Sequence, residues 1–488
     1  MNIKSIRLQN FRGFKDELIV LKPLTVLLGP NSAGKSSFGH ALAAMAHAHK
    51  IYAAGAPGPV SLTPPAFYAG TWPVDLGKTN DLRTVGVEAG PVCIGLETAS
   101  GDLLEFGFGG LEYDPNLIFS SILHPSAEHD SLASTSSPTV GRGEKSASTE
   151  SSARPAVVPP PDAQGSFIPI PEISAPIKLN RINELQWQDD AKDEWLVFLK
   201  GLSVDGVEDK TRGRRILRGT ARDSLKSFLE NLTYLRATRE RPSRGYVDEL
   251  ARPQTIGYGG EQTPSILFRV GNDPLPVAYA EPPVIPNTID EAQKCDSKWK
   301  EKKDTLREAL NNWLVRLDVA ADVKIIQSSV DKKLQMRVTP KGQSSHDITE
   351  IGFGVSQVIP VLVAGLLQPK DSLFIVDLPE AHLHPRPQGA IADFFCSLAL
   401  SGRSCLVETH SEMFFHRLRL RAAMDPSLMD KIAVYFIDPP KNGVCNPPRL
   451  IDLGYEGELR WPEGFLQEAW ETETQISAVR EAQRLARG

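Results

Sequence analysis

One short stretch limits what this chain can fold into more than any other: Gly-Pro-Asn-Ser-Ala-Gly-Lys-Ser-Ser at residues 29–37. An apolar run at residues 24–28 precedes it, and an alanine-rich segment that we predict to be helical follows it. The glycines let the backbone curl so that successive N–H groups converge on a phosphate, and the positive end of the next helix adds to that field. A strand, then this loop, then a helix is the context the motif requires, so we predict a nucleotide-binding phosphate loop.

Residues of this loop have separate expected tasks. Lys35 reaches the β- and γ-phosphates, and the Ser36 hydroxyl is a ligand of Mg²⁺. The other loop residues expected to contact the nucleotide are Gly29, Asn31, Ser32, Ala33, Gly34 and Ser37. The alternative is a glycine-containing turn with a chance Gly-Lys-Ser, which the strand in front disfavours.

A phosphate loop alone does not separate kinases, GTPases, motors and ABC-like ATPases, but three later motifs do. The apolar strand at residues 372–377 ends in Asp377, where a phosphate-loop enzyme holds its second metal ligand. Another short strand, at residues 405–410, ends in His410. Before both comes the glycine-rich turn at residues 352–357, which enters an apolar segment.

Length and composition exclude several classes. The 488 residues with a formal charge of −6 are enough for more than one folded unit. No apolar run approaches the roughly 18 residues of a membrane span, and Lys4, Arg7 and Arg12 stand where a signal peptide needs apolar residues. The scattered cysteines form no C-x-x-C pair, which favours a reduced, cytoplasmic protein. The acidic balance argues against a wholesale nucleic-acid coat and still permits a local basic groove.

Apolar patterns predict two groups of strands. They lie at residues 3–8, 18–21, 24–28, 84–96 and 103–108, and then at 323–326, 334–338, 372–377, 405–410 and 431–437. Between the groups, residues 124–176 are rich in Ser, Thr and Pro, and we predict a disordered insertion there, with a docking or sensing role left open. Helical patterns at residues 195–202, 221–235 and 292–317 carry no sustained heptads, so no long coiled-coil arm is expected.

Two arginine runs stand out in the middle of the chain. They are Arg212, Arg214, Arg215, Arg218 and Arg222, then Arg236, Arg239, Arg241 and Arg244. A solvated surface is the default interpretation, and a groove for a nucleic-acid backbone or an acidic partner is the alternative. Only Tyr234 and Tyr246 lie nearby, which weakens the case for single-strand binding.

The order of these motifs resembles the ABC-type ATPase heads of the SMC, RecF and overcoming-lysogenization-defect (OLD) group. Within it, the chain looks similar to bacterial AAA-family ATPases that end in a small domain of unknown function, of the kind found in antiphage defence. The resemblance covers roughly residues 1–110 and 300–488, and the motifs that carry it lie at residues 8–14, 352–357, 379–385 and 454–465.

The resemblance implies an α/β fold: an ABC-type P-loop head with a mixed sheet, flanking helices, an antiparallel N-terminal subsheet and a large insertion before the glycine turn. We accordingly expect five parts: an N-terminal lobe (1–115), a low-complexity insertion (116–182), a helical insertion (183–318), a C-terminal lobe (319–440) and a tail (441–488). Trp461 and Phe465 are expected to pin the tail to the core.

In that family two heads sandwich two ATP molecules, each between the phosphate loop of one subunit and the glycine turn of the other. Here Gly352 and Gly354 would let amides approach the γ-phosphate, with Ser356 and Gln357 as polar partners. By the resemblance, Asp377 holds Mg²⁺ through water, and His410 contacts the γ-phosphate or the attacking water. The expected assembly is a homodimer joined by ATP, with larger oligomers left open.

One position departs from the pattern. Many ABC heads carry a catalytic glutamate directly after the aspartate, and this chain has Leu378. Losing a general base commonly costs a factor of about 10² to 10⁴ in rate. Glu380 is the nearest substitute, so we predict slow hydrolysis supported by Glu380, or an ATP-gated switch. His382 and His384, with His410, could be imagined as a zinc cluster, but side chains hydrogen-bonded at the dimer contact fit better.

The functional hypothesis is therefore an ATPase subunit of an antiphage defence or DNA-maintenance complex that controls a nuclease or another effector protein. Alternatives are a non-hydrolysing ATP-gated scaffold, or a RecF-like DNA repair ATPase. Nucleic acid is a possible partner, and nothing in the sequence indicates a membrane contact.

Overall fold

The structure is a computed structural model. It describes residues 3–53, 73, 76, 82–85, 91–99, 101, 103–109, 116–123, 219–248, 255–294, 296–451 and 453, without the side chains of 52–53, 116–123 and 219–223. The predicted insertion at 124–176, the predicted helix at 195–202, the arginines from 212 to 218 and the tail with Trp461 and Phe465 lie outside these residues.

A six-stranded mixed sheet forms the centre of the fold, in the order β16-β15-β3-β14-β13-β7. Its strands are β3 (Leu24–Leu28), β7 (Leu232–Leu235), β13 (Leu373–Asp377), β14 (Ser404–Glu408), β15 (Ile432–Phe436) and β16 (Arg449–Ile451). All adjacent pairs are parallel except β15 with β16. Four of the strands are buried along their whole length, because helices cover both faces of the parallel part, and their sequences are accordingly continuous apolar runs.

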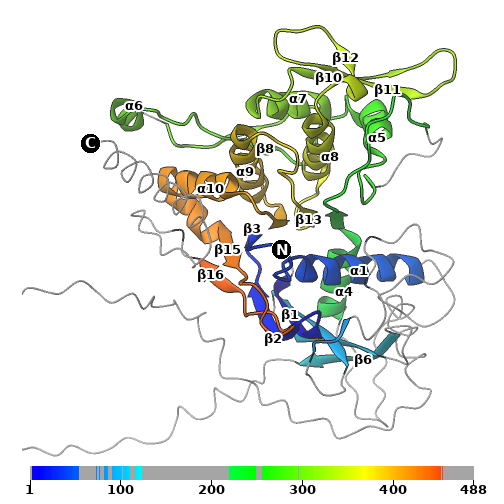
Figure 1. The fold of residues 1–488 in the computed structure, drawn as a ribbon, viewed down its shortest axis with the longest axis vertical. Helices are drawn as coiled ribbons and strands as arrows, with labels where there is room; N and C mark the ends of the chain where they lie inside the picture. The colour runs from blue at the N-terminus through cyan, green and yellow to red at the C-terminus, as the bar shows by residue number, and fades with distance from the viewer. Residues whose placement is uncertain are drawn as a thin grey trace, which may run out of the picture. The chain divides into compact units, whose positions relative to one another are not determined.

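Alternate residues of each central strand enter two different cores. Leu373 and Ile375 pack with α1 (Ser36–Ala53) and α4 (Gly219–Glu230), whereas Phe374 and Val376 pack with α8 (Phe353–Leu367), α9 (Pro385–Leu400) and α10 (Glu412–Met424). In Figure 1, α1 and α4 lie together on one side of the sheet and α8, α9 and α10 on the other. The result is an α/β fold with a mixed sheet and flanking helices, as the resemblance implied.

The predicted antiparallel N-terminal subsheet is present. It has five strands in the order β2-β1-β4-β5-β6, which are β1 (Ile3–Phe11), β2 (Phe14–Val20), β4 (Val92–Thr98), β5 (Leu103–Gly109) and β6 (Asn116–Leu123). The strand predicted at 84–96 was placed too early, because Thr84 binds a loop: its N–H donates to Asn10 Oδ1 at 3.0 Å, and its hydroxyl donates to the Phe14 carbonyl at 2.8 Å.

Smaller elements complete the described chain. They are strands β8 (Tyr279–Glu281), β9 (Lys300–Lys302), β10 (Asp322–Gln327), β11 (Leu334–Thr339) and β12 (His346–Asp347), helices α5 (Thr263–Val270), α6 (Ile289–Lys294) and α7 (Leu306–Arg316), and the 3₁₀ turns Ile348–Glu350 and Pro426–Lys431.

Two helix predictions were partly wrong. The helix predicted at 221–235 ends at Glu230, and residues 232–235 form β7, whose β-branched and aromatic residues pair with β13 at the sheet edge. The helix predicted at 292–317 is two helices with β9 between them. A new helix starts at α7 because Thr305 and Glu308 form a capping box there.

Candidate nucleotide site

The phosphate loop and the two strands that precede Asp377 and His410 meet at the carboxyl ends of the central strands. The loop at residues 29–37 follows β3, Asp377 ends β13, and Glu408 ends β14, which lies between them. Asp377 pairs with Glu408, and Glu408 pairs with Leu27. The carboxyl ends of parallel strands are where ligands of α/β sheets bind.

The backbone of the loop at residues 29–37 needs glycine at two positions. Gly29 has φ +144° and Gly34 has φ +96°, both in a region that side chains disfavour. A Cβ at Gly29 would collide with the Ile437 carbonyl, and one at Gly34 with the side chains of Cys445 and Phe14. The loop ends where α1 begins, so the N-terminus of that helix faces it.

Lys35 is buried, with 3% exposure, and its ammonium contacts two groups of the site. Its ammonium donates to the Pro30 carbonyl at 2.7 Å and lies 3.9 Å from Glu408 Oε1. Burial lowers the pKa of Lys35, and the carboxylates of Glu408 and Glu380 oppose that shift. A triphosphate would offer this ammonium stronger partners than a single carbonyl.

Asp377 is fixed from two sides. Its Oδ2 accepts from the Tyr234 hydroxyl at 2.6 Å and lies 3.5 Å from His40 Nε2. Burial, and then the charge of Asp377, raise the pKa of Tyr234 far above its ordinary value, so the phenol stays a donor. The carboxylate is thereby held in one orientation at the strand end.

Arg239 supports the same strand end from behind. Its Nη2 donates to the carbonyls of Asp377 at 2.8 Å and Leu378 at 3.1 Å. Burial lowers the pKa of Arg239 to about 10, against the opposing charges of Glu380 and Asp377. The solvated-surface interpretation of the second arginine run was therefore wrong for Arg239. Its side chain is 3% exposed, because it reaches inward to the carbonyls of Asp377 and Leu378.

Glu380 joins the loop after β13 to the loop after β14. Its Oε1 accepts the backbone N–H of His410 at 2.9 Å, while Oε2 is buried and has no partner. Burial raises the pKa of Glu380, and hydrogen bonds from Thr409 and His410 oppose the shift. His410 in turn bonds to the backbone of Gly29, and burial, then the Lys35 charge, lower its pKa.

Sequence reasoning missed several residues of this cluster. Glu408, 8% exposed, bonds to the Ser36 hydroxyl, and burial followed by the Asp377 charge raises its pKa. His40 could have been found, because it stands one helical turn after Ser36. Tyr234 and Arg239 could not, because only the pairing of β7 with β13 brings them to the site.

The glycine turn lies at the start of α8. Gly352 and Phe353 are exposed, and the Ser356 hydroxyl donates to the Phe353 carbonyl at 2.7 Å. A Cβ at Gly354 would collide with the His382 carbonyl. Gln357 is buried instead, and its amide lies 3.4 Å from the Glu240 carbonyl. Within the residues described, no hydrogen bond or ion pair joins this turn to residues 29–37 of the same chain.

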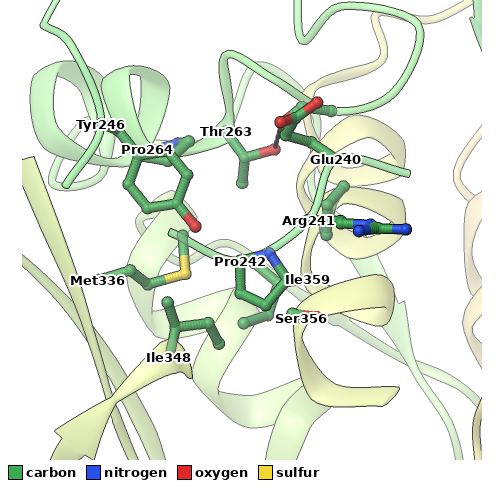
Figure 2. A pocket seen from close by; sticks show the side chains of 12 residues that line it. Glu240, Arg241, Pro242, Tyr246, Thr263, Pro264, Met336, Ile348, Ser356 and Ile359 are labelled. Atoms are coloured by element: carbon green, nitrogen blue, oxygen red, sulfur yellow. Dashed lines mark hydrogen bonds between the residues drawn. The ribbon is translucent and has the colours of Figure 1, made fainter. Parts of the chain in front are cut away.

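A pocket beside the first turns of α8 lies between the glycine turn and the segment that follows Arg239 (Figure 2). Glu240 and Arg241, directly after Arg239, line it from one side, and Ser356 and Ile359 line it from α8. The Gln357 amide thus contacts the residue that directly follows Arg239.

The donor set suits Mg²⁺. The Ser36 hydroxyl and the Asp377 carboxylate lie on either side of Glu408, which bonds to Ser36 and pairs with Asp377. Mg²⁺ is usually bound by one or two carboxylates plus substrate phosphates and water. In the described ranges, no group of three or more His, Cys, Asp or Glu residues could hold a metal by itself. His382, from the zinc alternative, is exposed and packs edge-on against the Phe353 ring, with centroids 4.8 Å apart.

No helix in the described part of the chain is both long and apolar enough to cross a membrane.

Several solved structures and one family model are similar to this chain. The chain is similar to the SMC head domain from Thermotoga maritima, with 10% identity, coverage of 91% of this chain and 97% of that chain, and a TM-score of 0.35. It is also similar to the Smc head domain from Pyrococcus furiosus bound to the C-terminal domain of ScpA, with 10% identity, coverage of 98% and 99%, and a TM-score of 0.37. No curated protein matches the chain. The family described as AAA ATPase domain matches residues 1–80 and 249–415, just over half of the chain, and the protein belongs to that family.

Proposed function

We propose that this protein binds ATP·Mg²⁺ at the edge of the central sheet and hydrolyses it slowly, at an interface between two heads. One observation carries the proposal: the loop at residues 29–37, the Asp377 carboxylate and the Glu380–His410 pair lie on neighbouring strand ends, with Lys35 3.9 Å from Glu408. Phosphate-loop enzymes work mainly by positioning and by stabilising charge, and this cluster holds the groups for both.

Each residue has a stated task. The loop amides from Gly29 to Ser37, with Asn31, Ser32, Ala33 and Gly34 between them, cradle the phosphates, and Lys35 neutralises the β- and γ-phosphates. Ser36 and Asp377 hold the metal, which when bound offsets charge on the triphosphate. His410 contacts the γ-phosphate, next to the loop that it already bonds.

Glu380 is the proposed proton acceptor. A water oxygen attacks the γ-phosphorus, the bond from that phosphorus to the β–γ bridging oxygen breaks, and ADP leaves. The water proton passes to Glu380, whose Oε2 is buried without a partner and whose raised pKa favours accepting it. Leu378, directly after Asp377, cannot take a proton, so proton transfer depends on Glu380 and slow hydrolysis is expected.

The glycine turn supports the dimeric arrangement. In the described residues, the turn makes no hydrogen bond or ion pair with the phosphate loop of its own chain. The N-terminus of α8 is exposed there and is suited to a phosphate held by a second head. Gly352, Gly354 and Ser356 would lie against that γ-phosphate, and buried Gln357 would support the turn from inside. Hydrolysis would remove the shared phosphate and loosen the dimer.

The biological role we propose is that of an OLD-like cytoplasmic ATPase subunit in antiphage defence or DNA maintenance, controlling an effector protein such as a nuclease. The SMC head structures to which the chain is similar include ones bound to the partner protein ScpA. This role, a RecF-like repair function, larger oligomers and nucleic-acid contact are proposals drawn from the motif order.

The test compares nucleotide binding and phosphate release for the native chain and Lys35→Ala. Lys22→Ala is the matched control, because Lys22 also donates to a backbone carbonyl, that of Met429 at 3.0 Å, and it precedes the first residue of β3, whereas the phosphate loop follows the last. The proposal predicts that Lys35→Ala loses both activities and that Lys22→Ala keeps them. Equal binding by the native chain and Lys35→Ala would contradict it.

A second candidate, a non-hydrolysing scaffold, is favoured by Leu378 alone. It predicts that the native chain binds ATP but releases phosphate no faster than Lys35→Ala.

A further inference from the structure

Glu408 has a feature that the tasks above do not use. Its side chain is 10% exposed, and its Oε2 atom is buried with no hydrogen-bond partner. Burying a carboxylate oxygen without a hydrogen-bond partner costs free energy of folding, so such atoms in folded proteins usually bind a water, an ion or a ligand.

Glu408 lies next to the two proposed metal ligands, Ser36 and Asp377. It bonds to the hydroxyl of Ser36, the loop's metal ligand, and stands directly opposite Asp377 in the parallel pairing of β13 with β14. The nearest cation is Lys35, at 3.9 Å. When Lys35 turns to a triphosphate, Glu408 is left without that cation, and a divalent ion beside Ser36 would replace it.

We propose that Glu408 is a second carboxylate that binds the nucleotide's Mg²⁺, together with Asp377 and Ser36. This inference rests on the proposed function and names a further metal-binding residue at the same site. Two carboxylates, a hydroxyl and phosphate oxygens match the oxygen-rich, octahedral preference of Mg²⁺. A role as proton acceptor fits less well, because Glu408 faces Ser36 and Asp377, whereas the unpartnered oxygen of Glu380 accompanies His410.

The experiment measures Mn²⁺ affinity by electron paramagnetic resonance on the full chain with bound ADP, for the native protein and Glu408→Gln. Gln has nearly the same shape and can still accept from Ser36. We expect Mn²⁺ affinity to fall about 10-fold or more. Binding of ADP in excess chelator should not weaken, because a negative charge near the phosphates has been removed.

Asp393→Asn is the matched control, since it removes another buried carboxylate, one that bonds to Arg421 outside the nucleotide site, and it should keep native Mn²⁺ affinity. Glu408→Asp retains the charge on a shorter side chain and should lie between native and Gln. If Glu408→Gln does not fold, Glu408→Asp alone decides the matter.

Native Mn²⁺ affinity in Glu408→Gln, or in Glu408→Asp where that variant decides, would overturn the inference. If phosphate release fell at the same time, Glu408 would act on the water instead. Failure of the native chain to bind ADP or ATP at all would overturn the proposed function and this inference together, so the two failures are distinguishable.

Discussion

Glu380 accepts the backbone N–H of His410 at 2.9 Å, although the two residues are 30 positions apart in the chain. The bond holds the loop after β13 against the loop after β14, and His410 continues the connection to Gly29. The proposed base and the proposed γ-phosphate contact are therefore one unit, whose geometry depends on a single carboxylate.

Replacing Glu380 separates its two tasks. Glu380→Gln keeps an acceptor for the His410 N–H but cannot take a proton, so we expect native stability and ATP binding with phosphate release slower by about 10²-fold or more. Glu380→Ala also leaves the partly buried N–H of His410 without this acceptor, so the free energy of unfolding should fall by about 1–3 kcal/mol. Phosphate release measures the effect on turnover, and urea unfolding measures the effect on stability. Native turnover in Glu380→Gln would mean that another group accepts the proton.

Tyr234→Phe removes the hydroxyl that donates to Asp377. Because hydrogen bonds to charged groups are the stronger ones, the free energy of unfolding should fall by about 1–3 kcal/mol, and Mg²⁺-dependent ATP binding should weaken. Tyr435→Phe is the control, since that hydroxyl bonds only to the Val20 backbone and should leave metal-dependent binding intact. Equal ATP binding by both variants and the native chain would remove Tyr234 from the site.

The two glycines of the turn at the start of α8 should respond differently to alanine. A Cβ at Gly352 meets nothing within 4 Å, whereas one at Gly354 collides with the His382 carbonyl. Gly354→Ala should lower the free energy of unfolding by more than about 1 kcal/mol. Gly352→Ala should change it by less than about 0.5 kcal/mol. It should still weaken ATP-dependent dimerisation, because in the proposed dimer the new methyl group would face the partner's phosphate. Native dimerisation by a well-folded Gly352→Ala would place the turn away from the interface.

His47 in α1 should make the fold acid-sensitive. Burial lowers its pKa to about 4 from an ordinary value of 6.5. Between those values the unfolded chain binds more protons than the folded one, so the contribution of His47 to stability is lost as pH falls from 6.5 towards 4. Glu17 acts in the opposite direction, because burial raises its pKa to about 7 and its contribution is lost as pH rises from 4.5.

His47→Gln isolates the histidine contribution, since glutamine can still bond to the Tyr258 hydroxyl without titrating. Urea unfolding at about pH 7 and about pH 5 should show a smaller acid loss in the variant than in the native chain. The same loss in both would assign the acid sensitivity to other groups.

The parts of the site that follow a strand could be predicted from the sequence. The loop at 29–37 and Asp377 directly follow mostly apolar runs, and His410 comes two residues after the strand Ser404–Glu408; such runs indicate buried parallel strands. Their convergence follows from the strand order, in which β14 lies between β3 and β13. The roles assigned to these residues stay predictions, as do the five domain boundaries.

The supporting residues could not be predicted because they depend on tertiary pairing. Tyr234 was taken as the end of a helix, and only its place in β7, beside β13, brings its hydroxyl to Asp377. Arg239 was read as part of a charged surface, and nothing local distinguishes it from Arg236, which pairs at the surface with Glu261 at 3.3 Å. Burial of a charge is decided by the whole fold.

The most direct measurement is the mass of Glu380→Gln in solution, by analytical ultracentrifugation, with and without ATP and Mg²⁺. We expect Glu380→Gln to be a monomer without nucleotide and a dimer with ATP·Mg²⁺, which persists because hydrolysis is blocked. The double variant Glu380→Gln/Lys35→Ala should be a monomer under both conditions. A mass that does not change with ATP·Mg²⁺, or a dimer that forms equally well with Lys35→Ala, would contradict an ATP-joined pair of heads.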